Sequence, residues 1–107
     1  MLVPFPFDDL SSIKVRPALC LTDEIGTYRH VVISFITSQV QKAVESSDIP
    51  LLPTAPGFAT TGLKMASALR LHRLVTIPSS LVQRQLGDLP PAFQRDVETK
   101  LRLIFGL

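Results

Sequence analysis

The segment His30–Thr37 constrains the fold more than any other part of this chain. Valine, isoleucine and phenylalanine occupy both sets of alternating positions, so a strand built from this segment has apolar side chains on both faces. Such a strand needs cover on both sides, which it obtains inside a sheet with other elements packed on it. The segment therefore predicts the central strand of a β-sheet.

Two further strands are predicted before this one. Leu2–Phe7 is apolar but carries Pro4 and Pro6, and because proline cannot donate to a strand ladder, this strand belongs at an edge or a bend. Val15–Thr22 is rich in aliphatic residues, and the turn residues of Thr22–Thr27 close a hairpin into the central strand.

After the central strand the pattern is mixed. Asp48–Gly62 holds three prolines and two glycines, which predicts an irregular segment with one short strand near Ile49–Leu52. Ser67–Ile77 predicts another strand, with Arg70 and His72 on one face and Leu69, Leu71 and Val75 on the other. Ser79 or Ser80 is expected to cap a short helix ending at Gln85 or Leu86, with Gly87 in a left-handed conformation.

From Pro91 onward the spacing is helical. Apolar residues recur at steps of three and four, with Pro91 suited to the first turn and Gly106 to the end; they are Phe93, Val97, Leu101, Ile104 and Phe105. Strands followed by a helix predict a mainly β (α+β) fold, a small β-barrel on which the C-terminal helix packs. The 107 residues are expected to form one domain, residues 1–107.

Composition adds expectations about surroundings and partners. The hydrophobic fraction of 46% and the mean hydropathy of +0.31 are high for so small a chain, and a subunit interface would bury the excess. The single cysteine, Cys20, is expected to be a buried structural thiol. The N-terminus has no basic leader and carries prolines and aspartates, which predicts a cytoplasmic protein with no membrane segment.

The net charge of only +2 means that any nucleic-acid site must be local. The fold would have to gather cations that, taken one by one, are ordinary solvated surface residues: Lys14, Arg16, Lys64, Arg70, Arg73 and Arg84.

Few kinds of catalysis fit these residues. His30 and His72 are not at metal-ligand spacing, and there is no glycine-rich phosphate loop, so neither a metal nor another cofactor is expected. Chemistry that uses the substrate's own nucleophile remains, and RNA supplies one in its 2′-hydroxyl. Arg16, stiffened by Pro17, suits the charge of a phosphorane.

Both candidate groups have simpler interpretations. Arg16 can be a surface ion-pair partner of Asp8 or Asp9. Thr37, at the end of the central strand, can bond to the neighbouring backbone. Both histidines are expected to face solvent.

Four short motifs in order resemble the MazF/PemK family of toxin endoribonucleases. They are Val3–Leu10 with Lys14–Leu19, His30–Gln39 with its Ile36-Thr37-Ser38 signature, Thr61–Arg70, and Leu86–Leu89 with the last helix. The resemblance covers essentially the whole chain, except that the family usually carries a few more residues, ending in Gly-Asp, before the first strand. It implies the SH3-like barrel that this family shares with the gyrase-poisoning toxins.

The resemblance implies catalytic roles for Arg16 and Thr37 at the scissile phosphate. Substrate binding is assigned to Ser12, Lys14, Ser38, Gln39, Lys64 and Ser67. Some members have an aspartate near the position of Ser67 and give it an acid or base role, so the general base here stays unassigned.

The implied function is that of a toxin of a type II toxin–antitoxin system. It would be a metal-independent, sequence-specific endoribonuclease that cuts single-stranded mRNA by attack of the 2′-hydroxyl, leaving a 2′,3′-cyclic phosphate and a 5′-hydroxyl. Implied partners are a second copy in a homodimer and an acidic antitoxin, through which alone it would contact operator DNA. The alternatives are a non-catalytic binding toxin or adaptor on the same barrel, such as a gyrase poison, and an inactive family member.

Overall fold

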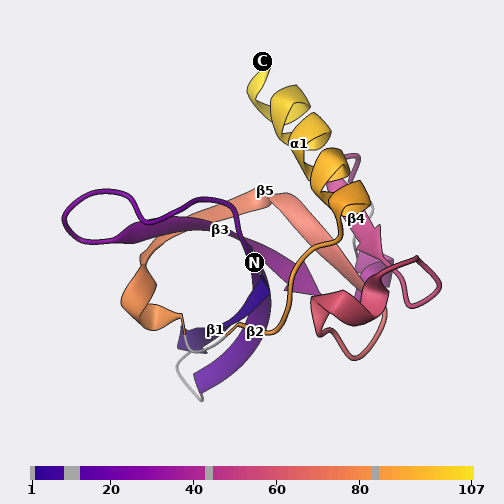
Figure 1. Ribbon diagram of the computed structural model, residues 1–107, viewed down its shortest axis with the longest axis horizontal. Helices are drawn as coiled ribbons and strands as arrows, with labels where there is room; N and C mark the ends of the chain where they lie inside the picture. Colours follow the sequence, from indigo (N-terminus) through magenta and orange to yellow (C-terminus); the bar gives the residue numbers. More distant parts are fainter. Residues whose placement is uncertain (1, 9–12, 43–44, 83–84) are drawn as a thin grey trace.

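A computed structural model describes residues 2–8, 13–42, 45–82 and 85–107. Its main feature is one strongly curved antiparallel sheet of five strands in the order β1-β2-β3-β5-β4 (Figure 1). The strands are β1 (Leu2–Asp8), β2 (Ile13–Cys20), β3 (His30–Thr37), β4 (Asp48–Leu51) and β5 (Ser67–Pro78). The mainly β fold with a C-terminal helix is confirmed, and β3 is the central strand as its two apolar faces predicted.

Proline sets the position of β1. This strand lies at an edge of the sheet and pairs with β2 along its length, from Leu2 opposite Leu19 to Asp8 opposite Ile13. An edge strand has one side without a ladder partner, which tolerates the missing N–H groups of Pro4 and Pro6. The expected edge position is confirmed.

The two faces of the sheet bury separate apolar clusters. Leu19 of β2 and Ile36 of β3 belong to the larger cluster, which also contains Val97 of the C-terminal helix. Ala18 and Ile33, neighbours on the opposite face, belong to a smaller cluster. β3 therefore contributes side chains to both clusters, which explains why its sequence is apolar at both sets of positions.

The pairing of β3 with β5 contains an irregularity. Ile36 pairs with Leu69, but Ser34 pairs with Leu74, so the register shifts between them. Leu69 is opposite Ile36 of the larger cluster, whereas Val75, expected on the same face as Leu69, is opposite Ile33 of the smaller cluster on the other face. The expectation for Val75 is wrong because the period of two does not continue through such a shift.

Among the described residues of the segment after β5, there is less helix than expected. They form one 3-10 turn, η3 (Ser79–Leu81), and Val82 after it is extended. Two further 3-10 turns are η1 (Val40–Lys42) and η2 (Phe58–Thr61). Gly87 does not have the left-handed conformation expected of it; instead, a Cβ at Gly87 would lie 2.2 Å from the carbonyl oxygen of Thr60. Close backbone approach, rather than a turn, requires glycine there.

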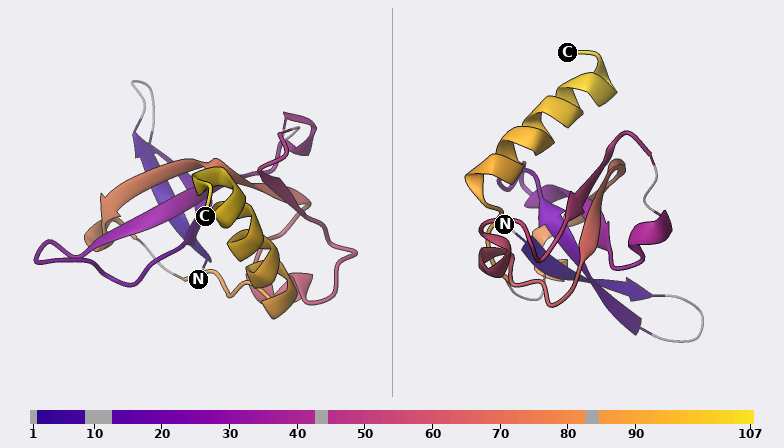
Figure 2. Two further views of the ribbon diagram at one scale, coloured as in Figure 1. Left: turned by 90° about the horizontal axis from the view of Figure 1, so that it is seen from above. Right: turned by 90° about the vertical axis from the view of Figure 1, so that its right-hand side faces the viewer.

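The C-terminal helix α1 (Pro91–Phe105) begins at a proline and ends at Gly106, which is left-handed at φ 68°. Val97 is buried in the larger cluster, but the last turn extends beyond the sheet (Figure 2) and leaves Phe105 60% exposed. Within the described residues, no helix is long and apolar enough to span a membrane.

Candidate active site

The register of β2 with β3, extended past its last ladder pair, relates Arg16 to Thr37. The ladder matches Cys20 with Ile33 and Ala18 with Phe35. Continued by two residues on each strand, the same register sets Arg16 opposite Thr37, on the face that carries Ala18 and Phe35. Arg16 is exposed and Thr37 is half-buried, so this position borders solvent.

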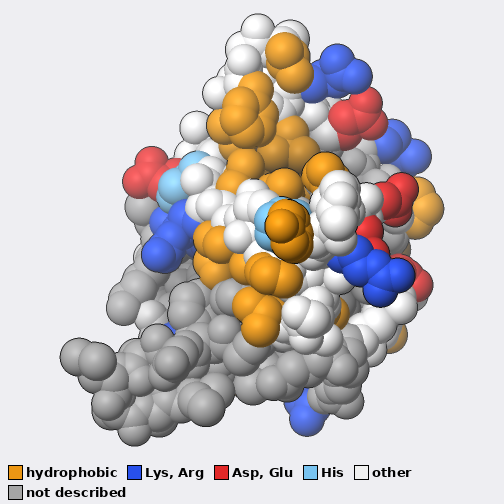
Figure 3. Space-filling model, turned by 90° about the vertical axis from the view of Figure 1, so that its left-hand side faces the viewer, with side chains coloured by type: hydrophobic (Ala, Val, Ile, Leu, Met, Phe, Trp, Pro, Cys, Tyr) orange, Lys and Arg blue, Asp and Glu red, His pale blue; other side chains and the backbone are white. Residues whose placement is uncertain are grey.

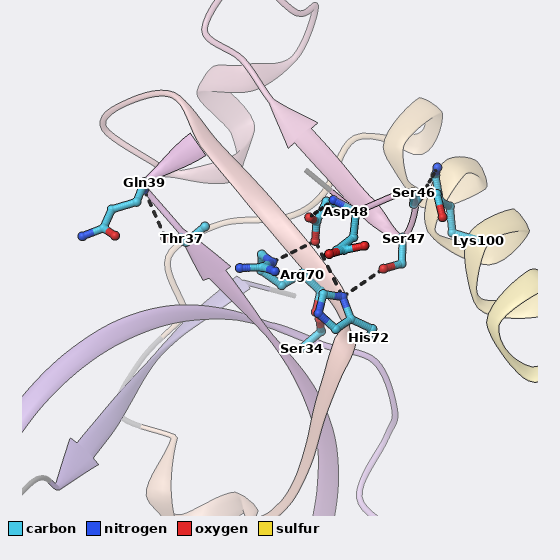
Figure 4. A network of polar contacts seen from close by, with 10 residues as sticks. Ser34, Thr37, Gln39, Ser46, Ser47, Asp48, Arg70, His72 and Lys100 are labelled. Carbon is cyan, nitrogen blue, oxygen red and sulfur yellow. Dashed lines mark hydrogen bonds and ion pairs between the residues drawn. The ribbon is translucent and has the colours of Figure 1, made fainter. Parts of the chain in front are cut away.

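Thr37 makes the local bond expected of a threonine at a strand end. Its Oγ1 accepts a hydrogen bond from the backbone N–H of Gln39 at 3.1 Å. A hydroxyl that accepts in this way still has its own O–H to donate. Ser38 and Gln39 are exposed just beyond the strand (Figure 4), so the bond orients the hydroxyl without removing it from solvent.

Of the other predicted substrate residues, Ser67 and Lys64 precede or begin β5 near the position where it pairs with Thr37. Ser67 begins β5 next to Ala68, which pairs with Thr37, but Ser67 is only 3% exposed and its hydroxyl donates to the carbonyl oxygen of Met65 at 2.9 Å. Lys64 is exposed three residues before Ser67. The backbone of Lys14 pairs with Phe7 in the hairpin of β1 and β2, whereas Ser12 lies outside the described residues.

A second polar cluster, formed by Asp48, Arg70, His72 and Ser47, was not predicted from the sequence (Figure 4). Asp48 and Arg70 are opposite each other in the pairing of β4 with β5. Arg70 Nε donates to Asp48 Oδ1 at 2.9 Å, and the two side chains are 16% and 3% exposed. Asp48 Oδ2 accepts the backbone N–H of Glu45 at 3.0 Å. The two oppositely charged residues were visible in the sequence, but their pairing depends on the strand register.

His72 does not form a nucleophile-activating triad with its neighbours. Its Nδ1 lies 2.9 Å from Ser47 Oγ and 3.7 Å from Asp48 Oδ1. A Ser-His-Asp relay needs the serine and the carboxylate on different ring nitrogens, whereas here both approach the same one. His72 is partly exposed, in line with the expectation of a solvent-facing residue.

The opposite end of β3 has different surroundings. A pocket of about 440 Å³ lies there, lined mainly by residues of the hairpin between β2 and β3 and by Ser79, Ser80 and Val82. Cys20 lines this pocket and is half-buried, with its Sγ 3.3 Å from the carbonyl oxygen of Thr22. It is therefore less buried than expected. His30 is at this end too, with its ring 6.1 Å from that of Tyr28, away from Thr37.

Comparisons with known proteins concern the family and the fold of the chain. Residues 1–105 match the family model described as PemK-like, MazF-like toxin of type II toxin-antitoxin system. The structure resembles Mycobacterium tuberculosis toxin MazF-mt6, with a TM-score of 0.74 and 24% identity over 99% of this chain and 96% of that one. It also resembles an endoribonuclease in complex with its cognate antitoxin from Mycobacterial species, with a TM-score of 0.65 and 17% identity over 98% and 90% of the two chains. A search of curated proteins finds no match.

Proposed function

Because this chain belongs to the PemK-like, MazF-like toxins of type II toxin–antitoxin systems, we propose that it is an endoribonuclease that cleaves single-stranded RNA. The observation that supports this proposal is the register of β2 with β3, which, extended by two residues on each strand, sets Arg16 opposite Thr37 on one face of the sheet. The two residue types supply what in-line attack by a 2′-hydroxyl needs from a protein: a fixed cation and a nearby hydroxyl donor.

In the proposed reaction the 2′-oxygen of the RNA attacks the adjacent phosphorus while the bond from phosphorus to the 5′-oxygen breaks. The 2′-hydroxyl gives up its proton and the departing 5′-oxygen gains one, leaving a 2′,3′-cyclic phosphate and a 5′-hydroxyl. Arg16 would engage the non-bridging oxygens through its planar guanidinium, which stays charged. The Thr37 hydroxyl would donate to the same phosphate group. The proton acceptor stays unassigned, and no step needs a metal ion.

A single RNA substitution tests the reaction. A long RNA would be incubated with the protein in EDTA and its cleavage sites mapped; an oligonucleotide around one site would then be made with and without a 2′-deoxy sugar on the 5′ side of the cut. The all-ribose form should be cleaved to a cyclic phosphate, and the deoxy form should remain intact. Cleavage of the deoxy form would contradict attack by the 2′-hydroxyl. Absence of all cleavage would favour the non-catalytic toxin or the inactive member.

The proposed active unit is a homodimer. Figure 3 shows hydrophobic side chains in a strip that extends from α1 over the neighbouring face, and Leu103 and Phe105 near the end of α1 are 75% and 60% exposed. A monomer seldom leaves so much contiguous apolar surface in water. Light scattering at micromolar concentration should give twice the chain mass, and a folded monomer would contradict the dimer.

The proposed inhibitor is an acidic antitoxin segment. The second structural neighbour is described as being in complex with its cognate antitoxin, and a protein face that binds RNA through cations attracts acidic peptides by the same charges. Such a segment would compete with RNA for the face that carries Arg16. Cleavage of a fixed RNA should fall as the antitoxin is added and recover with excess substrate.

A further inference from the structure

The register shift in β5 fixes one arginine beside the candidate active site. Between the pairs Ile36–Leu69 and Ser34–Leu74, β3 has one residue, Phe35, whereas β5 has four, residues 70–73. Bulges of this kind interrupt the ladder and redirect side chains, and they are common beside active sites. Here the ladder is replaced locally by a side chain, because Ser34 Oγ donates to the carbonyl oxygen of Arg70 at 2.8 Å. Ser34 is completely buried, so the backbone of Arg70 is held from inside.

The side chain of Arg70 is held as well. Asp48 Oδ1 accepts from Nε at 2.9 Å, and Asp48 is itself fixed by the N–H of Glu45 on its other oxygen. A guanidinium has five N–H donors in one plane. Of the N–H groups of Arg70, only Nε–H has a hydrogen-bond partner among the described residues. The two Nη groups are left as a fork of donors, and Asp48 sets the plane of that fork.

This fork lies on the face that carries the candidate catalytic pair. Ala68 pairs with Thr37, and Arg70 follows Ala68 by two residues, so their side chains share a face. A residue diagonal to Thr37 in this way is within reach of a long side chain. In Figure 4 the guanidinium of Arg70 bonds to Asp48 on one side, and its other nitrogens point toward the side where Thr37 and Gln39 lie.

The charge of the pair indicates what it binds. Asp48 offsets the charge of Arg70, so the pair attracts a phosphate weakly, but the direction of its donors is unchanged. The pair is neutral overall, and the two Nη groups of its arginine form a rigid fork of donors. Such a fork matches a base edge with two adjacent acceptors. Guanine presents O6 and N7 in that arrangement, and arginine is their commonest partner. In single-stranded RNA this edge is open to a side chain.

We propose that Arg70, oriented by Asp48 and Ser34, binds the O6 and N7 edge of a guanine adjacent to the scissile phosphate and so sets part of the cleavage sequence. The proposal rests on the proposed endoribonuclease function and deepens it. Arg70 would contact the substrate, whereas Asp48 and Ser34 are positioning residues.

The test compares base preferences rather than total rates. A randomised RNA would be digested by the wild type, Arg70→Gln, Asp48→Asn and the double variant Asp48→Asn/Arg70→Gln, and the bases around the cuts would be sequenced. The double variant leaves no buried unpaired charge, so it guards against misfolding of Arg70→Gln, and the melting temperature of each variant would be recorded. The matched control is Arg73→Gln, which removes the same charge from an exposed position of the same strand.

The wild type should prefer guanine at one position next to the cut by roughly 5- to 150-fold. Both Arg70 variants should lose that preference while cleavage continues. Asp48→Asn keeps the cation but loosens its orientation, so it should weaken the preference and keep or raise total RNA binding. Arg73→Gln should keep the preference. Cleavage that shows no guanine preference, or a preference that survives in the folded double variant, would overturn the proposal and leave the endoribonuclease function standing.

A binding measurement separates the two proposals. Wild type and double variant would be titrated with non-cleavable 2′-O-methyl oligonucleotides that contain guanine or 7-deazaguanine, which lacks the N7 acceptor. Guanine should bind more tightly than 7-deazaguanine to the wild type only. If RNA is never cut but this difference is present, the catalytic function is wrong and the guanine site stands. Absence of both cleavage and the difference overturns both.

Discussion

Arg16 and Arg70 occupy the two strands that flank β3, on the same face of the sheet, but their surroundings differ. Arg16 is exposed and is followed by a proline that stiffens its backbone. Arg70 is largely buried and its charge is offset by Asp48. An exposed cation suits charge that develops on a phosphate, whereas a buried ion pair supplies direction with little net charge. The same residue type on one surface can therefore serve two different tasks.

The largest expected difference between the two arginines is in stability, which should fall much more in Arg70→Ala than in Arg16→Ala. Arg70→Ala leaves Asp48 charged and nearly buried without its partner, and breaking a buried pair typically costs about 3–5 kcal/mol. Arg16→Ala removes an exposed side chain whose surface contacts are worth little, and it should lower the free energy of unfolding by no more than about 1 kcal/mol. Urea unfolding at one fixed protein concentration measures both. Similar losses in the two variants would remove the contrast.

The rate of RNA cleavage should depend more strongly on Arg16 than on Arg70. Arg16→Ala should slow RNA cleavage by roughly 100- to 1000-fold, since that is the usual effect of removing one preorganised donor to transition-state charge. Arg16→Lys keeps the charge without the planar fork and should recover only part of the rate. Single-turnover cleavage of one RNA measures this. Arg29→Ala is the control, because Arg29 is 75% exposed in a surface ion pair with Glu24. Wild-type cleavage by Arg16→Ala would place the active site elsewhere.

The sequence suggested Arg16 as a candidate site residue, but it did not suggest the pairing of Arg70 with Asp48. Strand positions, the edge location of β1 and the helix from Pro91 follow from periodicity and proline chemistry, which act locally. Arg16 and Thr37 lie in short recognisable motifs, Arg16 within β2 and Thr37 at the end of β3. Asp48 and Arg70 are 22 positions apart and become partners only through the register of β4 with β5. That register is a contact between segments far apart in the chain, and no local pattern marks it.

Two other differences have the same origin. Gly87 was expected to stop a helix, but its neighbour is the backbone of Thr60, a contact formed between distant segments. Val75 was expected on the face of Leu69, but the shifted register sets it opposite Ile33, on the other face. Local chemistry predicted the strands and the helix, whereas contacts between distant segments determined the surroundings of Gly87, Val75 and the Asp48–Arg70 pair.

Ser34→Ala tests whether the bulge is held by a side chain. The variant removes the donor to the carbonyl oxygen of Arg70, and a buried acceptor left without a partner costs about 1–3 kcal/mol. The free energy of unfolding should fall by that amount, and the guanine preference should weaken because Arg70 is held less firmly. Ser80→Ala, a change at an exposed serine after β5, is the control. An unchanged preference with the expected loss of stability would limit Ser34 to a structural role.

The smallest expected effect is that of Thr37→Val. Valine has nearly the same shape, so only the hydroxyl is lost, and the N–H of exposed Gln39 can bond to water instead. Stability should therefore stay within about 0.5 kcal/mol. The rate should fall by about 10-fold, which corresponds to one hydrogen bond to a charged group, and less than in Arg16→Ala because the cation remains. Thr37→Ser restores the hydroxyl and should restore most of the rate, whereas Thr76→Val makes the same change at an exposed position of β5 and should have no effect. If Thr37→Val cuts as fast as the wild type while Arg16→Ala does not, the threonine only shapes the strand end through Gln39, and Arg16 acts at the phosphate without it.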